Sequence, residues 1–448
     1  MGGLLQELRG GRLMARVLRS TSWILLGYGG SQALRLVSNL ILTRLLFPEA
    51  FGLMALVSLV TVGLMLFSDV GIAPSIAQSK RGDDPDFLNT AWSIQVIRGV
   101  VLWAIATALA APLAAFYDAP QLATYLPIAA LALLVTGFNP TRIETAHRHL
   151  LMGRLTVLDL TSQVIGIVVM IALAWWLQSV VALVIGGVVG PLAKLALTWA
   201  YLPGDANRFR WERPAVRELV TFGKWIFLST IFWFFASQGD RAVLGKFLSL
   251  DSLGIYNIAF FLASFAMQLG TAVTGRVMIP VYRDAKHETG KIAKLRWGIS
   301  AVVLTLLLGM ALAGPWLVGV LYDPRYAAGG AIVTLLAVAQ IPQIIGMSYD
   351  QAALAAGDSR RFFVVSATRA VLQIALLITG VSLFGLVGAI AGIGLAHVLT
   401  HPVIIWLART HDAWDMRHDI VFALGAGSIG ALAIWLHRDA VLGLSALG

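Results

Sequence analysis

Residues Lys246–Asn257 read KFLSLDSLGIYN, and residues Arg44–Ala55 read RLLFPEAFGLMA. At an offset of 202 residues, a cation, an acid and a glycine of the earlier stretch fall on a cation, an acid and a glycine of the later one. The aligned pairs are Arg44 with Lys246, Glu49 with Asp251, and Gly52 with Gly254. In both copies an apolar run ends at the cation, a turn with an acid follows, and a new apolar run begins at the glycine. We infer that the chain contains an internal duplication.

Two further matches follow in the same order. Residues 112–118 (PLAAFYD) recur as 315–323 (PWLVGVLYD) with two extra residues, and 180–186 (VVALVIG) resemble 386–392 (LVGAIAG) at an offset of 206. Ordered matches with a drifting offset favour a duplicated half of about two hundred residues over the short repeats of a solenoid. Coincidence among apolar segments of low variety is the alternative.

The composition predicts a polytopic membrane protein. Hydrophobic residues make up 58% of the chain and charged residues only 12%, whereas soluble domains carry about 25% charge. Apolar runs long enough to cross a bilayer, about 20 residues each, recur along almost the whole length. The absence of cysteine excludes disulfides and thiolate chemistry. The run near 23–46 follows an arginine-rich tail, but it is too long and too polar for a cleaved signal peptide.

We expect six spans in each half and one more at the end. The predicted spans lie near 22–46, 51–79, 89–116, 121–139, 155–178, 180–201, 220–246, 252–279, 297–320, 327–350, 362–383, 386–408 and 419–437. The predicted regions are a cytoplasmic tail (1–21), an N-lobe (22–201), a linker (202–219), a C-lobe (220–408) and a C-terminal addition (409–448). The total of 12, 13 or 14 helices stays open.

The distribution of basic residues predicts the orientation. With these spans, 22 lysines and arginines fall on one side and only Arg325 and Arg438 on the other. Because cytoplasmic loops retain basic residues, the N-terminus is expected inside. An even number of spans in each half makes both halves enter the membrane in the same direction. The predicted fold is therefore all-α, with two six-helix lobes related by a pseudo-twofold axis along the membrane normal.

Three arginines are predicted to lie deep in the spans, namely Arg35, Arg98 and Arg369, and a fourth, Arg241, is predicted at intermediate depth. A central charge costs at least about 2.5–3.5 kcal/mol, so each needs a reason. Polar residues at helical spacing accompany them, namely Gln32, Asn39, Gln95 and Gln373. We expect these faces to line a wet cavity that attracts an anion such as pyrophosphate. Alternatively, the arginines bind backbone carbonyls or intramembrane acids and hold helices together.

The acids expected inside the membrane are Asp69, Asp159, Asp240 and Asp350. They are candidates for coupling transport to protons or sodium ions. His397 and His401 lie four residues apart and form a candidate proton or metal site, although a structural role is the simpler interpretation. The chain has neither an HExxH motif nor a Walker-type phosphate loop. We therefore predict no enzymatic activity, no resident cofactor, no metal and no nucleic-acid partner.

Four stretches resemble the polysaccharide transporter family, the Wzx-type flippases: TRLLFPEAFGLMALV (43–57), FSDVGIAPSIAQ (67–78), GDRAVLGKFLSLDSLGIYNIAFFLA (239–263) and VMIPVY (277–282). The resemblance places the chain in the superfamily of the MATE exporters and the peptidoglycan-precursor flippase. It implies a bacterial inner-membrane protein that flips a polyprenyl-pyrophosphate-linked oligosaccharide by alternating access for O-antigen, capsule or exopolysaccharide assembly. A polymerase and a chain-length regulator would be partners. The alternatives are a MATE-like cation antiporter, a lipid II flippase, and an integral-membrane glycan enzyme such as a polymerase or acyltransferase.

Overall fold

The computed structural model describes residues 11–68, 71–284 and 289–447. In these ranges the chain forms helices and no β-strand, which confirms the predicted all-α membrane fold. Nine helical segments of the described chain are long and apolar enough to cross a membrane. A tenth is formed if the segment Gln121–Gly137 and the helix Arg142–Arg148, bent by 60°, are counted as one span.

The chain divides into two compact units. Unit 1 comprises Met1–Leu46 and Val57–Ile231, and unit 2 comprises Phe47–Leu56 and Phe232–Gly448. A short piece of the N-terminal half therefore belongs to the unit built mainly from the C-terminal half. The predicted boundaries at 201 and 220 remain predictions, because the division by compactness falls inside one long helix.

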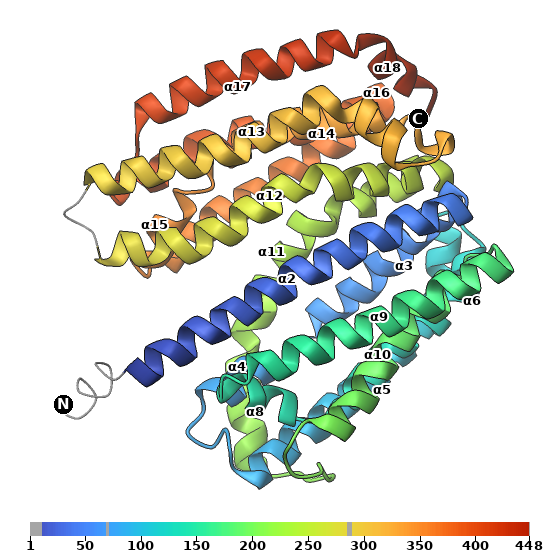
Figure 1. Ribbon diagram of the computed structural model, residues 1–448, viewed down its shortest axis with the longest axis vertical. Helices are drawn as coiled ribbons and strands as arrows, with labels where there is room; N and C mark the ends of the chain where they lie inside the picture. The colour runs from blue at the N-terminus through green and yellow to red at the C-terminus, as the bar shows by residue number, and fades with distance from the viewer. Residues whose placement is uncertain (1–10, 69–70, 285–288, 448) are drawn as a thin grey trace. The chain divides into compact units, whose positions relative to one another are not determined.

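Unit 1 is built on helix pairs that approach through small residues. Its helices are α2 (Gly11–Leu45), the later part of α3 (Pro48–Phe67), α4 (Ile72–Gln78), α5 (Pro85–Phe116), α6 (Gln121–Ala129), α7 (Leu131–Gly137), α8 (Arg142–Arg148), α9 (Met152–Leu177), α10 (Val181–Tyr201) and the start of α11 (Arg213–Phe247). Helix α9 runs beside α2 and α10 (Figure 1). A Cβ on Gly166 of α9 would lie 3.0 Å from the Cα of Gly190 on α10, so the small residue at 166 lets the two helices approach closely.

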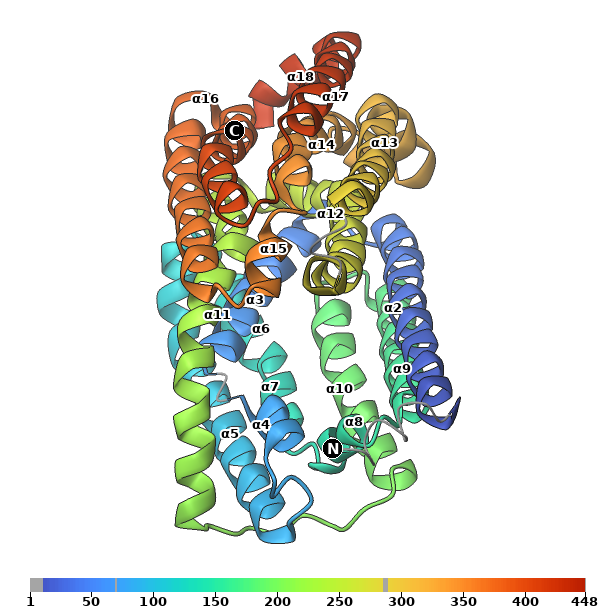
Figure 2. The ribbon, with the colours of Figure 1, turned by 90° about the vertical axis from the view of Figure 1, so that its left-hand side faces the viewer.

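Unit 2 is organised around one deeply buried helix. Its helices are the rest of α11, α12 (Leu250–Asp284), α13 (Thr289–Leu321), η1 (Pro324–Tyr326), α14 (Gly329–Gly346), α15 (Asp350–Ala355), α16 (Ser359–Thr410), α17 (Met416–Leu436), α18 (Arg438–Gly443) and η2 (Leu444–Leu447). Helix α14 contacts α12, α13, α16 and α17 (Figure 2). Its span is 78% buried, whereas that of α17 is 17% buried. The α17 helix therefore exposes most of its apolar surface.

The 52-residue α16 is two helices joined by a tight turn. The backbone leaves helical geometry at Phe384 and Gly385, and Gly385 has a positive φ of 57°. A Cβ on Gly380 would lie 2.1 Å from the carbonyl oxygen of Gly388, so the two halves run back along each other. The sequence predicts this break, because the expected spans end at 383 and begin again at 386.

The two copies of the repeated stretch meet inside unit 2. A Cβ on Gly52 would lie 1.8 Å from the carbonyl oxygen of Leu250, and a Cβ on Gly254 would lie 1.9 Å from that of Pro48. Pro48 and Leu250 are themselves aligned by the offset of 202. The contact is therefore reciprocal, as expected for two related segments that cross at a local twofold axis. The glycines aligned by sequence are the residues that let α3 and α12 touch.

Candidate functional site

The predicted site residues are distributed over both units. Arg35, Arg98 and Asp159 belong to unit 1, whereas Arg241 and Arg369 belong to unit 2. Asp69 lies outside the described residues. Each unit is therefore considered on its own, starting with the contacts that hold each charged side chain.

In unit 1, Arg98 closes the end of a neighbouring helix. Its Nε donates to the Ser68 hydroxyl at 2.9 Å, and a terminal nitrogen donates to the carbonyl oxygen of Met65 at 2.6 Å. Gln95, one turn earlier, donates to the carbonyl oxygens of Thr136 and Asn139, both at 3.1 Å. Both side chains satisfy carbonyl oxygens that a helix end leaves without an intrahelical partner. These contacts are those expected under the alternative interpretation, in which the arginines bind backbone carbonyls and hold helices together.

The polar face of α2 is partly accessible. Gln32 and Asn39 are half-buried, and Arg35 between them is exposed. Spacings of three and four residues place all three on one face of the helix. The structure thus keeps a cation and two amides together on this face of α2.

Asp159 on α9 forms an ion pair with Lys194 on α10. The carboxylate oxygen and the Nζ atom are 2.7 Å apart, and the two side chains are 54% and 34% exposed. The lysine therefore neutralises the acid. This pair links the two most closely packed helices of unit 1.

In unit 2, Arg241 on α11 is held by neutral groups. Its Nε donates to the amide oxygen of Asn257 at 3.0 Å, and a terminal nitrogen donates to that of Gln238 at 2.9 Å. The guanidinium lies 4.6 Å from the ring centre of Phe260, within cation–π range. The neighbouring Asp240 instead accepts a hydrogen bond from the buried Tyr256 hydroxyl at 2.8 Å. Within the described chain, no carboxylate forms an ion pair with Arg241, so its charge is oriented but not neutralised.

Arg369 and Asp350 form a second intramembrane ion pair. The distance between a guanidinium nitrogen of Arg369 and Oδ2 of Asp350 is 3.1 Å, and the side chains are only 17% and 12% exposed. The pair joins α16 to α15. Gln373, one turn further along α16, is also buried. Two groups with separate predicted roles, an anion ligand and an ion carrier, are thus partners of each other.

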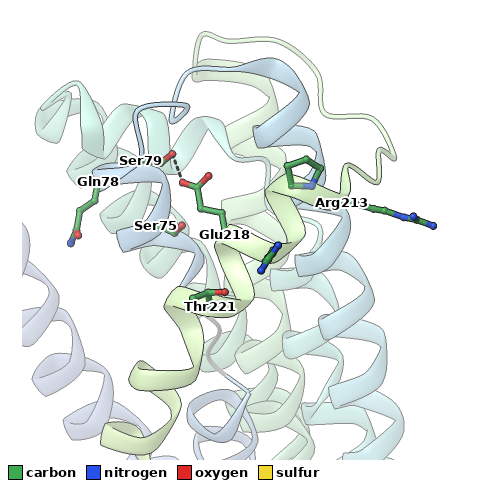
Figure 3. A pocket seen from close by; sticks show the side chains of 8 residues that line it. Ser75, Gln78, Ser79, Arg213, Glu218 and Thr221 are labelled. Atoms are coloured by element: carbon green, nitrogen blue, oxygen red, sulfur yellow. Dashed lines mark hydrogen bonds between the residues drawn. The ribbon is translucent and has the colours of Figure 1, made fainter.

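Unit 1 contains a cavity of about 900 Å³ between α4 and the start of α11 (Figure 3). Besides Pro214, its lining residues carry three hydroxyls, an amide, two guanidiniums and one carboxylate. The lining residues are Ser75, Gln78, Ser79, Arg213, Pro214, Arg217, Glu218 and Thr221. The Ser79 hydroxyl donates to Glu218 at 2.6 Å, which ties the two helices together at the mouth. The sequence assigns Arg213 and Arg217 only to a basic loop and does not predict this cavity.

Ion pairs fix the loop beside this cavity. Arg81 binds Asp84 at 2.6 Å and Glu212 at 2.8 Å, and so links the α4–α5 loop to the start of α11. The hydrogen bond from Arg81 holds the pKa of the Asp84 carboxyl below its usual value, and the backbone N–H of Asp86 acts in the same direction. Asp84 also caps α5, whose first residue is Pro85.

The histidines of α16 have different surroundings. His401 Nε2 lies 3.1 Å from Oδ2 of Asp419 on α17, whereas His397 is buried with its Nδ1 unpartnered. No group of three His, Asp or Glu residues suited to a metal ion occurs in the described ranges. The pair at 397 and 401 is therefore not a shared site. The partner that the sequence could not identify for His401 is Asp419.

Comparison with known proteins gives one family and several distant relatives. The model of the family described as "Polysaccharide biosynthesis protein" matches residues 41–328. The teichuronic acid biosynthesis protein TuaB of Bacillus subtilis (strain 168) is 20% identical over 82% of this chain and 75% of its own length. The succinoglycan biosynthesis transport protein ExoT of Rhizobium meliloti (strain 1021) is 24% identical over 72% of this chain and 66% of its own length.

Among solved structures, the lipid II flippase MurJ in its inward closed conformation resembles this chain with a TM-score of 0.68. The match covers 93% of this chain and 99% of the other at 11% sequence identity. At this identity the likeness defines the fold and does not define the cargo.

Proposed function

Because this chain belongs to the polysaccharide biosynthesis protein family, whose model matches residues 41–328, we propose that it flips a lipid-linked oligosaccharide across a membrane. The cargo of this proposal is a polyprenyl-pyrophosphate-linked repeat unit for O-antigen, capsule or exopolysaccharide. The protein exposes its binding site alternately to the two sides of the cytoplasmic membrane, with its N-terminus inside. The family match is the observation that carries the proposal, and the similarity to the succinoglycan biosynthesis transport protein ExoT supports it.

Arg241 supports an anionic cargo. A pyrophosphate in an apolar medium needs positive charge and hydrogen-bond donors in place of water. A guanidinium offers five donors in a planar fork and binds phosphate oxygens in pairs. In Arg241 this fork is oriented by two amide oxygens and a ring, and its charge is left for a ligand.

The other three candidate arginines contribute differently in this proposal. Arg369 would bind the anion and keep its ion pair with Asp350. Arg98 would bind the anion and keep its hydrogen bond to the end of the neighbouring helix. Arg35 is exposed on the polar face of α2. We therefore expect Arg241 to be the most sensitive of the four to substitution. A polymerase and a chain-length regulator are proposed to receive the product.

The test is a deletion of the gene, followed by mass spectrometry of polyprenyl-linked glycans and an assay of surface polysaccharide. We expect a complete lipid-linked repeat unit to accumulate and the surface polymer to disappear. An unchanged lipid pool together with altered drug sensitivity would instead support a MATE-like exporter.

Complementation then tests the arginine. Arg241→Ala should fail to restore the polymer, and Arg241→Lys should restore it only in part, because lysine keeps the charge but loses the paired geometry. The matched control is Arg438→Ala, which removes a guanidinium that is 65% exposed and should complement fully. Normal export by Arg241→Ala at normal protein abundance would refute the role of Arg241 and leave the flippase assignment standing.

A further inference from the structure

Asp419, near the start of α17, lies at the centre of a buried hydrogen-bond cluster. Its carboxylate is surrounded by groups from α16, α17 and the segments before α15 and α17. Its partners are the Tyr349 hydroxyl (2.7 Å) and His418 Nδ1 (3.0 Å) on Oδ1, and His401 Nε2 (3.1 Å) and Trp414 Nε1 (3.1 Å) on Oδ2. An ionised carboxylate only accepts hydrogen bonds, so each ring nitrogen that faces it carries a hydrogen. This arrangement fixes the tautomer of both imidazoles when they are neutral.

The far nitrogens of the two imidazoles differ. His418 is fully buried, and its Nε2 lies 2.9 Å from the Ser300 hydroxyl, which can donate to it. His401 Nδ1 is buried and, in the described part of the chain, has no hydrogen-bond partner. With Nε2 donating to Asp419, this Nδ1 has a free lone pair. It is the one nitrogen of the two rings that is ready to accept a proton without breaking a bond.

The charge balance of the cluster leaves room for one proton. Arg296 on α13 is 3% exposed and lies 4.0 Å from Asp415, which accounts for its charge. It also stacks on the Tyr349 ring at 4.7 Å and donates to the Tyr282 hydroxyl at 2.9 Å. Asp419 then remains as an unbalanced negative charge. A net charge removed from water is costly unless a counter-charge joins it.

The remaining charged and titratable groups around the cluster do not supply that counter-charge. Arg409 lies 4.0 Å from the Trp414 ring but is exposed at the end of α16. His397, one turn before His401, makes no bond to Asp419. Two other acids of the predicted spans, Asp159 and Asp350, each form an ion pair with a basic side chain, and Asp240 accepts a hydrogen bond from the Tyr256 hydroxyl.

We propose that His401, His418 and Asp419 form a proton-binding site of unit 2, and that it is the ion-coupling site of the transport proposed above, on which this inference rests. One proton from solution binds Nδ1 of His401 and converts the imidazole to imidazolium, while Nε2–H still donates to Asp419. The charge of Arg296, Asp415, Asp419 and the two histidines changes from −1 to 0. Release of the proton reverses the step, and no other bond changes.

The site lies where a proton can act on helix packing. His401 and Asp419 line an apolar groove of about 780 Å³ between α14, α16 and α17. Through this cluster α17, most of whose surface is exposed, is held to α16 and α13. A change of one charge in an apolar setting therefore alters how strongly α17 is held.

The test uses the full-length protein in vesicles, with the lipid-linked repeat unit extracted from the deletion strain as the probe. Flipping is measured with and without an imposed pH gradient, and the ratio of the two rates is compared between proteins. We expect the gradient to change the rate several-fold in the unaltered protein, and the ratio to fall to one in His401→Gln and Asp419→Asn. The control His437→Gln, at the other end of α17, should keep the original ratio.

Three outcomes would overturn the proposed proton site. The ratio of the two flipping rates could be one in the unaltered protein, it could stay unchanged in both His401→Gln and Asp419→Asn, or it could fall to one in His437→Gln. Absence of any flipping by the unaltered protein would refute the proposed function instead. Proton uptake between pH 8 and pH 5 in detergent tests the site independently of transport. Asp419→Asn should take up about one proton fewer, whereas Asp439→Asn, at a 90% exposed side chain, should not differ from the unaltered protein. Equal uptake by Asp419→Asn would overturn the proposal.

Discussion

The crossing of Gly52 and Gly254 gives a prediction whose size follows from the structure. An alanine at 254 would place its Cβ 1.9 Å from the carbonyl oxygen of Pro48, 2.7 Å from its carbon and 3.0 Å from the nitrogen of Gly52. Ordinary contact begins at 3.4 Å, so α3 and α12 must separate by about 1.5 Å at this point. The obstacle is backbone, which cannot rotate away as a side chain can.

Overpacking of this kind costs about 1–3 kcal/mol. For a unit of this size, each kcal/mol lowers the midpoint of thermal unfolding by about 2–4 °C. We expect Gly254→Ala and Gly52→Ala each to lower the midpoint accordingly in detergent, as measured by the fraction that remains monodisperse after heating. Because the two glycines share one contact, the midpoint of thermal unfolding should decrease less in the double variant than the sum of the decreases in the two single variants.

The matched control is Gly275→Ala in the same helix, where no atom lies within 4 Å of the added Cβ. Alanine there should leave the midpoint unchanged or raise it, because glycine in a helix costs up to about 1 kcal/mol relative to alanine. Gly254→Ala and Gly52→Ala variants that both unfold at the temperature of the unaltered protein would refute the crossing of the two stretches.

Two further predictions concern the loops on the two sides of the membrane. The protein contains no cysteine, so single introduced cysteines can report the orientation in the membrane. Ala206→Cys should react with an impermeant maleimide only from the cytoplasmic side, and Asp439→Cys should react only from the outside. The reverse pattern would refute the inward N-terminus. Because the pKa of Asp84 is lowered by Arg81, its stabilising effect is present above its unfolded value of about 3.9 and is lost as the pH falls through the folded value. The midpoint temperature of unfolding should therefore decrease when the pH is lowered below 4, and it should decrease less in Asp84→Asn. An equal decrease of the midpoint temperature in both proteins would contradict the role of this pair.

The sequence predicts the helical membrane fold because its signal is local, although thirteen spans are expected and nine or ten helical segments of the described chain are long and apolar enough to cross a membrane. A run of apolar residues reports its own burial in lipid, and the turn at Phe384 and Gly385 interrupts such a run. The predicted membrane fold and the polysaccharide-transport family are confirmed. The repeat also has a local signal, since two stretches of similar letters can be aligned without knowledge of their contacts.

The partners of the charged residues could not be predicted, because they depend on contacts between distant parts of the chain. Arg98 reaches Met65, and His401 reaches Asp419, across gaps that no helical spacing encodes. The sequence offered one hint for the second pair, namely an adjacent His418 and Asp419 at the start of a mostly apolar helix. Whether Arg35, Arg98, Arg241 and Arg369 bind the cargo stays a prediction.

The ion pairs suggest why a chain with several basic residues in its predicted spans can still keep a few charges for function. Lys194 and Arg369 are matched by Asp159 and Asp350, so these charges enter the membrane in neutral pairs that join neighbouring helices. Among the described residues of unit 2, Arg241 and the cluster around Asp419 are not matched in this way, the first with an excess positive charge and the second with an excess negative charge. A bare charge in lipid is maintained against its cost only where a ligand completes it. An anion at the first and a proton at the second would complete both, and these are the two species that a proton-coupled flippase of a pyrophosphate-linked lipid has to bind.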